Sequence, residues 1–322
     1  MNKPLSKKIT AIIPSLPDKD PEQALETLKK TDYPLDKIEV MITKGKNPSR
    51  QRNQAIDRAT GNIIFFFDDD SEIPKDYFKK ALEHYEDETI DAIGGPAETS
   101  RTAPFLQKCF GYVIGSYFAT QSMSNKFHGH GKVREATEKE LILCNFNIRK
   151  ESLGKNRFDE RLYPNEENEL FNRLKSEGKN FLYDPNLKIY RYRRKSILNF
   201  AKQFYKYGYG RIEHLIIRPR SFSPVFIIPP LFVIYLLLLI GLIFMQKAYP
   251  IYFIPLALYL LITIGSAAKI AITEKDPKTI LITPPLFLIV HTSYGIGMIT
   301  SLLNFRKTER PKEVKVTKIK LK

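Results

Sequence analysis

The sequence predicts an α/β fold with a doubly wound, mostly parallel sheet, followed by a C-terminal α-helical membrane region. Over roughly the first seventy residues, apolar strand-like runs alternate with amphipathic helix-like segments, and this β-α-β-α-β order is typical of a parallel sheet. Three stretches without a formal charge come later, at residues 221–246, 248–268 and 279–305. Each reaches the roughly 20 residues that a helix needs to cross a bilayer.

The elements of the N-terminal part follow from apolar periodicity. Strands are predicted over Ile9–Ile13, Lys37–Thr43 and Ile63–Phe67, and helices over Pro21–Lys30 and Ser49–Thr60. The uninterrupted apolar run of the third strand suits a strand that is buried on both faces of a sheet. The residues that follow such a strand are where an open α/β sheet binds its ligand.

Three adjacent carboxylates, Asp68, Asp69 and Asp70, follow the third strand directly. Neighbouring like charges repel each other unless a cation joins them, and oxygen ligands suit a divalent metal that carries a phosphorylated substrate. The pattern therefore predicts a metal-bound nucleotide. A competing interpretation is a helix start with Asp70 or Ser71 as the N-cap and Pro74 early in the helix. One cap needs only one acceptor, and the two interpretations are compatible.

Length and charge divide the chain into four parts. The 322 residues carry a formal net charge of +16, with 43% hydrophobic residues, which is enough for one globular domain and a membrane appendage. We expect a cytosolic catalytic domain over residues 1–187, a basic amphipathic juxtamembrane segment over 188–220, about three membrane segments over 221–305 and a basic tail over 306–322.

The start of the chain and its cysteines indicate the compartment. Met1–Lys8 is polar and basic and does not resemble a secretory signal, so we expect the first domain to stay in the cytosol of a multi-pass cell-membrane protein. Cys109 and Cys144 show no metal-ligand spacing, and we expect both to be packed thiols in a reducing compartment.

The segment 188–220 carries ten Lys or Arg residues against the single acid Glu213, with aromatic residues between them. Such a pattern can bind nucleic acid, because bases stack on rings and phosphates pair with cations. Here the segment leads directly into a membrane stretch, which favours an amphipathic segment on an anionic leaflet. We therefore expect membrane lipids as partners and no nucleic acid.

The number of membrane crossings stays open from sequence. Three crossings from a cytosolic N-terminus would place the tail outside. The tail, however, carries eight Lys or Arg residues against two Glu, and positive segments tend to remain in the cytosol. A re-entrant or interfacial stretch would resolve the conflict, with Pro229-Pro230 and Pro284-Pro285 as candidate breaks.

Four signals, in order, resemble the family 2 glycosyltransferases of the GT-A fold. Ile12-Ile13-Pro14-Ser15 closes the first strand, Arg52-Asn53-Gln54-Ala55 opens a helix, Phe67-Asp68-Asp69-Asp70 ends the third strand and Ile73-Pro74 follows it. Further matches are Gly94-Gly95-Pro96, Cys144 to Lys150, Gly154 with Phe158-Asp159-Glu160, Asn165 to Leu170 and Tyr183-Asp184-Pro185. The resemblance is firm over Ile9–Gly210. Together with His291–Gly295 in the more loosely matching membrane part, the set resembles membrane-anchored members that build lipid-linked or exported polysaccharides.

The resemblance implies a set of site residues. The implied nucleotide-sugar contacts are Pro14, Ser15, Thr43, Arg52, Asn53, Asp68 and Asp69, and the implied Mg²⁺ or Mn²⁺ ligands are Asp68 and Asp70. Glu167 is the first candidate for the catalytic base and Glu166 the second, although acidic residues in a first helical turn are also favoured by the helix dipole. Weaker candidates for acceptor or pyrophosphate contacts are Gly95, His128, His130 and Arg211.

One departure from the family concerns the nucleotide. The second strand usually ends in an Asp that contacts the base, and here Thr43 stands in that place. Threonine can hydrogen-bond a base but supplies no carboxylate, so the sequence leaves the base of the donor open. A second departure is Glu167, where the family commonly has Asp, and there only the reach of the carboxylate changes.

The leading hypothesis is a membrane-bound, metal-dependent, inverting transferase that moves a sugar from a nucleotide-sugar donor to a lipid-linked or glycan acceptor. An alternative is a polyprenyl-phosphate sugar synthase, whose anionic acceptor needs no base. A processive polysaccharide synthase is disfavoured, because the Gln-x-x-Arg-Trp motif of such enzymes is absent and the chain has no tryptophan. From another class comes a non-catalytic membrane-tethered scaffold with the same fold, since fold alone does not establish function.

Overall fold

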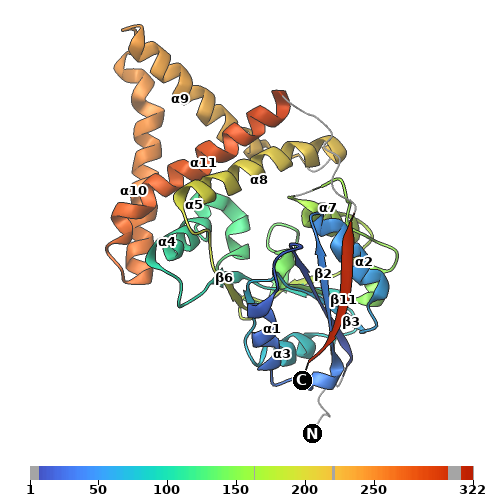
Figure 1. The fold of residues 1–322 in the computed structure, drawn as a ribbon. Coiled ribbons are helices and arrows are strands. Elements are labelled where there is room, and N and C mark those ends of the chain that lie inside the picture. Colours follow the sequence, from blue (N-terminus) through green and yellow to red (C-terminus); the bar gives the residue numbers. More distant parts are fainter. Residues whose placement is uncertain (1–6, 163, 220–221, 304–312, 322) are drawn as a thin grey trace. The chain divides into compact units, whose positions relative to one another are not determined.

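The structure is a computed structural model that describes residues 7–162, 164–219, 222–303 and 313–321 (Figure 1). The chain divides into two compact units. The first, which we call the sheet unit, comprises Met1–Thr102, Ser122–Tyr192 and Thr308–Lys322; the second, the helical unit, comprises Ala103–Gln121 and Arg193–Lys307. Relative to the sequence-based division, Lys188–Tyr192 and the C-terminal tail belong with the sheet unit, and Ala103–Gln121 belongs with the helices.

The sheet unit holds all the described strands. These are β1 (Ile9–Ser15), β2 (Ile38–Gly45), β3 (Ile63–Phe66), β4 (Ser71–Glu72), β5 (Ala92–Gly94), β6 (Ala97–Thr99), β7 (Arg134–Glu135), β8 (Phe146–Arg149), β9 (Phe181–Tyr183), β10 (Ile189–Arg191) and β11 (Val314–Lys320). Its α-helices are α1 (Glu22–Lys29), α2 (Pro48–Arg58), α3 (Tyr77–His84), α6 (Lys150–Leu153) and α7 (Glu166–Ser176). Short 3-10 helices are η1 (Leu35–Lys37), η2 (Gln121–Lys126, which begins at the boundary) and η3 (Leu143–Asn145).

The main sheet has eight strands in the order β11-β2-β1-β3-β8-β5-β9-β7, and β4-β10-β6 form a second, smaller sheet. The predicted parallel core is confirmed, because β1 pairs in parallel with β2 and with β3. The expectation that the sheet is mostly parallel is wrong, because most of its other strand pairs are antiparallel. Strand β5 pairs in parallel with β9, but β3–β8, β5–β8, β7–β9 and β11–β2 are antiparallel. The sheet is therefore mixed.

Apolar side chains cover both faces of the central strands, as the uninterrupted run Ile63–Phe67 predicts. Phe65 and Phe67 belong to one core cluster, which includes residues of α1 and α3. Ile64 and Phe66 belong to the other, which includes residues of α2 and α7. This alternation follows from the period of two in a strand. The sheet unit thus has three layers, with the strand ends of β1, β2 and β3 at one edge.

The segment after β3 is a turn and not a helix start. Helix α3 begins only at Tyr77, with Asp76 in the cap position. The alternative that made Asp70 or Ser71 the N-cap is therefore wrong, and the three aspartates need another explanation. The apolar face predicted for this helix, from Tyr77 to Leu82, is buried in the core.

The tail of the chain returns to the main sheet as β11. Seven residues, Val314–Lys320, pair antiparallel with Gly45–Glu39 of β2. Ile319 packs against the core and Leu321 is buried in it. Lys318 forms an ion pair with the buried carboxylate of Glu39, so the basic tail completes an edge of the sheet.

The helical unit contains α4 (Phe105–Ile114), α5 (Tyr117–Thr120), α8 (Ile197–Ile217), η5 (Pro224–Ile227), α9 (Ile228–Phe244), η6 (Pro250–Phe253), α10 (Ile254–Glu274) and α11 (Thr279–Leu303). Three of its helices are long and apolar enough to cross a membrane, at Pro224–Phe244, Pro250–Glu274 and Thr279–Leu303. Within this unit, α11 lies along α8, and α9 and α10, which both contact α11, form a hairpin whose connecting turn projects beyond that pair (Figure 1).

Both cysteines are free thiols and both are buried, as the sequence predicted. Burial raises the pKa of the Cys144 thiol to about 12, and this sheet-unit thiol therefore stays protonated and unreactive at neutral pH.

Candidate active site

The three aspartates form a tight turn directly after β3. The Asp68 N–H donates to Ser71 Oγ at 3.0 Å, and the Ser71 N–H donates to the Asp68 carbonyl oxygen at 3.1 Å. This turn holds the Asp68 and Asp70 side chains against Arg191 of β10. The guanidinium Nη1 lies 2.5 Å from Asp68 Oδ2, and Nη2 lies 3.0 Å from Asp70 Oδ1. One cation therefore neutralises part of a cluster of three like charges.

Arg191 remains charged in this setting. Burial by itself would lower the pKa of Arg191, but Asp70 and Asp68 raise it well above its ordinary value. The third carboxylate, Asp69, points elsewhere and pairs with Lys19 at 2.8 Å. Burial raises the pKa of Asp69, and Lys19 opposes that shift. Each aspartate thus has a basic partner, and these pairs hold the turn in place.

Arg52 joins this turn to the start of α7. Its Nη1 donates to Glu166 Oε1 at 2.9 Å, and its Nη2 lies 3.7 Å from Asp68 Oδ1. The Arg52 side chain is only 7% exposed and the Glu166 side chain 4%, so the pair is shielded from solvent. The Arg52 guanidinium therefore contacts both the acidic turn and the candidate base region. These two segments are about a hundred residues apart in sequence.

Glu166 and Glu167 begin α7 and differ sharply in environment. Asn165, which precedes them, has a φ of 87°, a left-handed conformation that asparagine tolerates better than most residues. Burial raises the pKa of Glu166 to about 7, with a further contribution from Glu167, while Arg52 opposes the shift. Glu167 is only half-buried, and its side chain forms no hydrogen bond or ion pair with the described residues. Its carboxylate is therefore the more accessible of the two.

The ends of β1 and β2 are tied together by Gln51 of α2. Its Nε2 donates to the carbonyl oxygens of Ser15 at 2.8 Å and Thr43 at 2.5 Å. Ser15 in turn donates through Oγ to the Lys19 carbonyl at 2.5 Å. Pro14 lies opposite Thr43 in the β1–β2 ladder. The side chain of Thr43 is fully buried and its Oγ1 has no hydrogen-bond partner among the described residues.

Asn53 is fully engaged in holding a neighbouring turn. Its Nδ2 donates to the Phe158 carbonyl at 2.9 Å and to Glu160 Oε1 at 3.2 Å, and its Oδ1 accepts from the Phe158 N–H at 2.8 Å. Both ends of the amide are therefore used. The structure links the Arg-Asn helix start to the Phe-Asp-Glu turn, and both Nδ2 hydrogen bonds of Asn53 are made within the protein.

Two other motifs also meet in space, because β5 pairs with β9 and Gly94 lies opposite Tyr183. The Asp184 N–H donates to the Gly94 carbonyl at 2.9 Å, and the Asp184 carboxylate pairs with His84 at 2.9 Å. A side chain at Gly95 would meet the Leu187 carbonyl oxygen at 2.1 Å. This close backbone approach explains the glycine, independently of any acceptor contact.

The remaining candidates are His128, His130 and Arg211. His128 and His130 lie side by side, with ring centroids 4.5 Å apart, and burial lowers the pKa of His128. Arg211 belongs to the helical unit, is only 6% exposed and lies 4.5 Å over the Phe226 ring, with Nε 3.3 Å from Tyr294 Oη. Within the described residues, no three His, Cys, Asp or Glu side chains are grouped so as to hold a metal ion.

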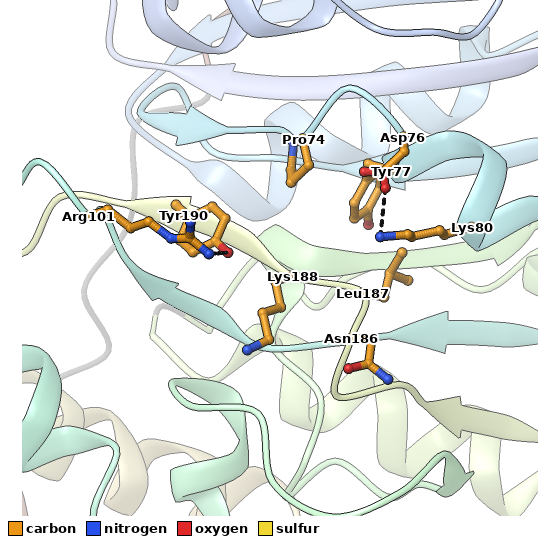
Figure 2. A pocket seen from close by; sticks show the side chains of 9 residues that line it. All are labelled: Pro74, Asp76, Tyr77, Lys80, Arg101, Asn186, Leu187, Lys188 and Tyr190. Atoms are coloured by element: carbon orange, nitrogen blue, oxygen red, sulfur yellow. Dashed lines mark hydrogen bonds and ion pairs between the residues drawn. The ribbon is translucent and has the colours of Figure 1, made fainter. Parts of the chain in front are cut away.

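A separate surface cavity of about 450 Å³ lies beside α3 and β10. Figure 2 shows Lys80, Arg101 and Lys188 around it. Lys80 pairs with Asp76 at 2.6 Å and Lys188 pairs with Glu98 at 2.8 Å, while Arg101 lies over the Tyr190 ring at 5.5 Å. The cavity therefore contains little unpaired charge. Tyr190 lines this cavity and directly precedes Arg191 in β10. Because successive side chains of a strand point to opposite faces, Arg191 belongs to the face opposite the cavity.

Sequence reasoning missed Arg191 and Lys19. Arg191 was included in the basic juxtamembrane segment, although its strand belongs to the sheet unit. A usable signal was the short alternation Ile189-Tyr190-Arg191 after Tyr183-Asp184-Pro185, which is typical of a strand rather than an amphipathic helix. Lys19 lies in the loop after β1 and offered no signal beyond its charge.

Comparison with known proteins identifies the family of the chain. The family model of glycosyl transferase family 2 matches residues 15–207, which is more than half of the chain. A GalNAc(5)-diNAcBac-PP-undecaprenol beta-1,3-glucosyltransferase of Campylobacter jejuni subsp. jejuni serotype O:2 is 25% identical over 211 residues, which cover 60% of this chain and 59% of that protein. The chain thus matches less than two thirds of the length of this relative.

Similar solved structures bear on the fold. Mannosyltransferase PcManGT from Pyrobaculum calidifontis, in complex with GDP-Man and Mn²⁺, has a TM-score of 0.55 and 14% sequence identity, covering 92% of this chain and 87% of that chain. S. aureus TarS 1-349 in complex with UDP-GlcNAc has a TM-score of 0.46 and 14% identity, covering 92% of each chain. The predicted GT-A-like α/β fold is confirmed by the likeness to the mannosyltransferase. The match of the family model over residues 15–207 shows that the chain belongs to glycosyl transferase family 2.

Proposed function

We propose that this chain is a metal-dependent, inverting glycosyltransferase that moves a sugar from a nucleotide-sugar donor to a lipid-linked acceptor. The observation that carries the proposal is the bridge made by Arg52, which contacts both Asp68 and Glu166. Direct displacement at a sugar carbon needs a group that stabilises the leaving diphosphate and a base that takes the proton of the attacking hydroxyl. The bridge keeps these two functions adjacent.

Glu167 is the proposed base. The acceptor hydroxyl attacks the anomeric carbon, its proton passes to the Glu167 carboxylate, and the bond to the nucleoside diphosphate breaks with its electron pair on the leaving oxygen. Glu167 suits this role because its carboxylate is accessible and forms no hydrogen bond or ion pair with the described residues. Glu166, in contrast, is buried against Arg52. Glu166 then acts as a positioning residue, since it holds the Arg52 side chain that also contacts Asp68.

The acidic turn fits a divalent cation. Asp68 and Asp70 offer hard oxygen donors, and buried Asp70 Oδ1 accepts no hydrogen bond of suitable geometry from the described residues, its near neighbour being the Arg191 guanidinium at 3.0 Å. Mg²⁺-type sites commonly use one or two carboxylates and fill the other positions with substrate phosphates and water. When bound there, Mg²⁺ or Mn²⁺ would act as a Lewis acid on the diphosphate. The complex of the similar mannosyltransferase with GDP-Man and Mn²⁺ supports this choice.

Arg191 pairs with the same two carboxylates. We propose that its guanidinium turns from Asp68 and Asp70 to the diphosphate when the donor binds, because its planar fork matches phosphate oxygens as well as carboxylates. Lys19, paired with Asp69 in the adjacent loop, would add positive charge on the same side. The nucleotide contacts proposed for Ser15 and Pro14 lie at the same strand ends.

The acceptor class is proposed from the curated relative, which by name acts on an undecaprenyl-diphosphate-linked glycan. A glycan hydroxyl acceptor needs a base, and the accessible Glu167 supplies one. We place the sheet unit on the cytosolic side of a cell membrane, because Lys and Arg are concentrated at both ends of the apolar region.

The test is turnover by the full-length protein purified in detergent. The assay uses a panel of nucleotide sugars, Mn²⁺ or Mg²⁺ and a membrane lipid extract as acceptor, and it measures release of nucleoside diphosphate. Glu167→Gln and Asp70→Ala should each abolish turnover, while Glu160→Gln, which lies on the neighbouring turn, serves as the matched carboxylate control. We expect the product sugar to have the opposite anomeric configuration from the donor.

Other outcomes separate the alternatives. Activity that survives in Glu167→Gln but not in Asp70→Ala would favour a polyprenyl-phosphate sugar synthase, whose acceptor is already ionised. Full activity after removal of divalent cations by chelation would refute metal dependence. Absence of both turnover and metal-dependent nucleotide binding with every donor would favour the scaffold interpretation.

A further inference from the structure

The C-terminal strand fixes which side of a membrane the chain ends on. Strand β11 pairs over seven residues with β2, and its Lys318 reaches the buried carboxylate of Glu39. Residues before and after the apolar region are therefore parts of one sheet. A sheet cannot be shared across a bilayer, because strands need continuous backbone pairing and lipid supplies no partners. The chain must cross the membrane an even number of times.

Among the described residues, three helices are long and apolar enough to cross, so at least one of them does not. Helix α11 differs from the other two. In its most apolar window, 39% of the residues are buried inside the protein, against 11% for each of the other two candidates. It also contains Pro284 and Pro285. Helix α9, and α10 up to Lys269, carry apolar outer surfaces, with Leu238 and Leu261 more than 60% exposed, as expected for helices that face lipid.

Helix α11 is packed along α8, in the most extensive helix–helix contact among the described residues (Figure 1). The two backbones touch at glycines. A methyl group at Gly208 would lie 2.0 Å from the Tyr294 carbonyl oxygen, and one at Gly297 would lie 2.1 Å from the Tyr205 carbonyl oxygen. Helices that are this close over this length share the same environment.

Helix α8 cannot lie in hydrocarbon. It carries Lys202, Lys206, Arg211 and Glu213 within 21 residues, with both lysines exposed, and charged groups at membrane depth are rare and costly. Exposed apolar residues of the same helix include Ile197, Leu198 and Ile216. A helix with exposed cations and exposed apolar groups is typical of the membrane surface, where lysine side chains reach the headgroups.

The pairing of β11 with β2 and the packing of α11 on the charged helix α8 are independent observations. From them, we propose that only α9 and α10 cross the bilayer. Helices α8 and α11 then form a pair that lies on the membrane surface, on the same side of the membrane as the sheet unit. The partner of this surface is an anionic leaflet. Charge supports the assignment, because the short turn between α9 and α10 contains one cation, Lys247, whereas Lys269, Lys275 and Lys278 are found around the turn between α10 and α11. Positive residues tend to stay on the cytosolic side.

Sidedness is tested with single cysteines in full-length protein in right-side-out and inside-out membrane vesicles. The buried Cys109 and Cys144 are first replaced by alanine, and exposed positions are then labelled with a membrane-impermeant maleimide. Lys79→Cys of the sheet unit is the reference. We expect Thr317→Cys of β11 to label from the same side as this reference and Tyr249→Cys, between α9 and α10, to label from the opposite side. Labelling of Thr317→Cys from the side opposite to the reference would overturn the proposal.

The position of α11 is tested by depth. A spin label at Ile296→Cys, on the exposed side of α11, is compared with one at Leu261→Cys, in the middle of α10, through their collision rates with oxygen and with a water-soluble nickel chelate. We expect the label on α11 to be at interfacial depth and the label on α10 near the bilayer centre. Equal central depths for both labels would show that α11 crosses, and the proposal would fail even with the tail on the expected side.

Discussion

Replacing Arg191 with glutamine removes the positive charge that lies between Asp68 and Asp70. If the guanidinium and a divalent cation compete for the same carboxylates, the variant should bind Mn²⁺ more tightly when no nucleotide is present. The same substitution should slow sugar transfer, because the leaving diphosphate loses a cationic partner. The two effects have opposite directions, so a general loss of structure does not mimic them.

The size of the first effect follows from the geometry. Opposite unit charges about 4 Å apart interact by about 4 kcal/mol at an effective dielectric constant of about 20. The three side chains are 22%, 26% and 27% exposed, and water screens such a partly exposed pair, so we take about half of that value for the carboxylate that a metal must free. About 2 kcal/mol corresponds to a roughly 30-fold gain in Mn²⁺ affinity.

Mn²⁺ binding is measured by calorimetry or by electron paramagnetic resonance on detergent-purified full-length protein. Turnover is measured in parallel, and we expect a loss on the order of 100-fold, as for removal of one donor that stabilises transition-state charge. Arg191→Lys should be intermediate in both assays. Arg157→Gln is the matched control, because this arginine pairs with Asp57 at 2.7 Å on the surface, away from the turn. Unchanged or weaker Mn²⁺ binding in Arg191→Gln would refute the competition.

Three further predictions address other parts of the molecule. Burial raises the pKa of Glu166 to about 7 and Arg52 opposes the shift, so activity should fall as the pH drops below neutral. Arg52→Gln should move this acidic limb of the pH–rate profile to higher pH. An unmoved limb would contradict the coupling between Arg52 and Glu166. Gly208→Ala should lower the thermal unfolding temperature of the detergent-purified protein, whereas Gly241→Ala, where a methyl group meets no atom within 4 Å, should leave it unchanged; equal effects would argue against close α8–α11 packing. Leu321→Ala, which removes a buried side chain of the tail, should destabilise the sheet unit by about 2 to 3 kcal/mol in chemical denaturation, and a change below about 0.5 kcal/mol would show that the tail strand contributes little.

The first three strands, their helices and the acidic turn were predictable because their signals are local. Apolar runs and turn residues at short spacing determine β1, β2 and β3, and the same residues are buried in the structure. The aspartates after β3 were correctly placed at the edge of the sheet where the strand ends meet. The interpretation of that segment as a helix cap was wrong, since α3 begins only at Tyr77.

Residues at the candidate site were less predictable when their role depends on a distant partner. Asn53 carries part of a family motif, yet its amide holds the turn at Phe158. Thr43 is the last residue of the predicted second strand, yet the observed strand continues to Gly45, β11 pairs with it and the threonine is fully buried. In both cases the partner segment lies more than a hundred residues away. The local periodicity of apolar residues carries no information about such a partner.

The sequence by itself determined an α/β domain with an acidic turn at its strand ends, a basic segment and an apolar C-terminal region, because composition and periodicity record burial and charge directly. Only the tertiary structure decided that Arg191 meets Asp68 and Asp70, that Arg52 bridges to Glu166, and that the basic tail becomes an edge strand. These are pairings between residues far apart in the chain. Their energies come from opposite charges and backbone groups brought together by folding, and the sequence of either partner alone does not reveal the other.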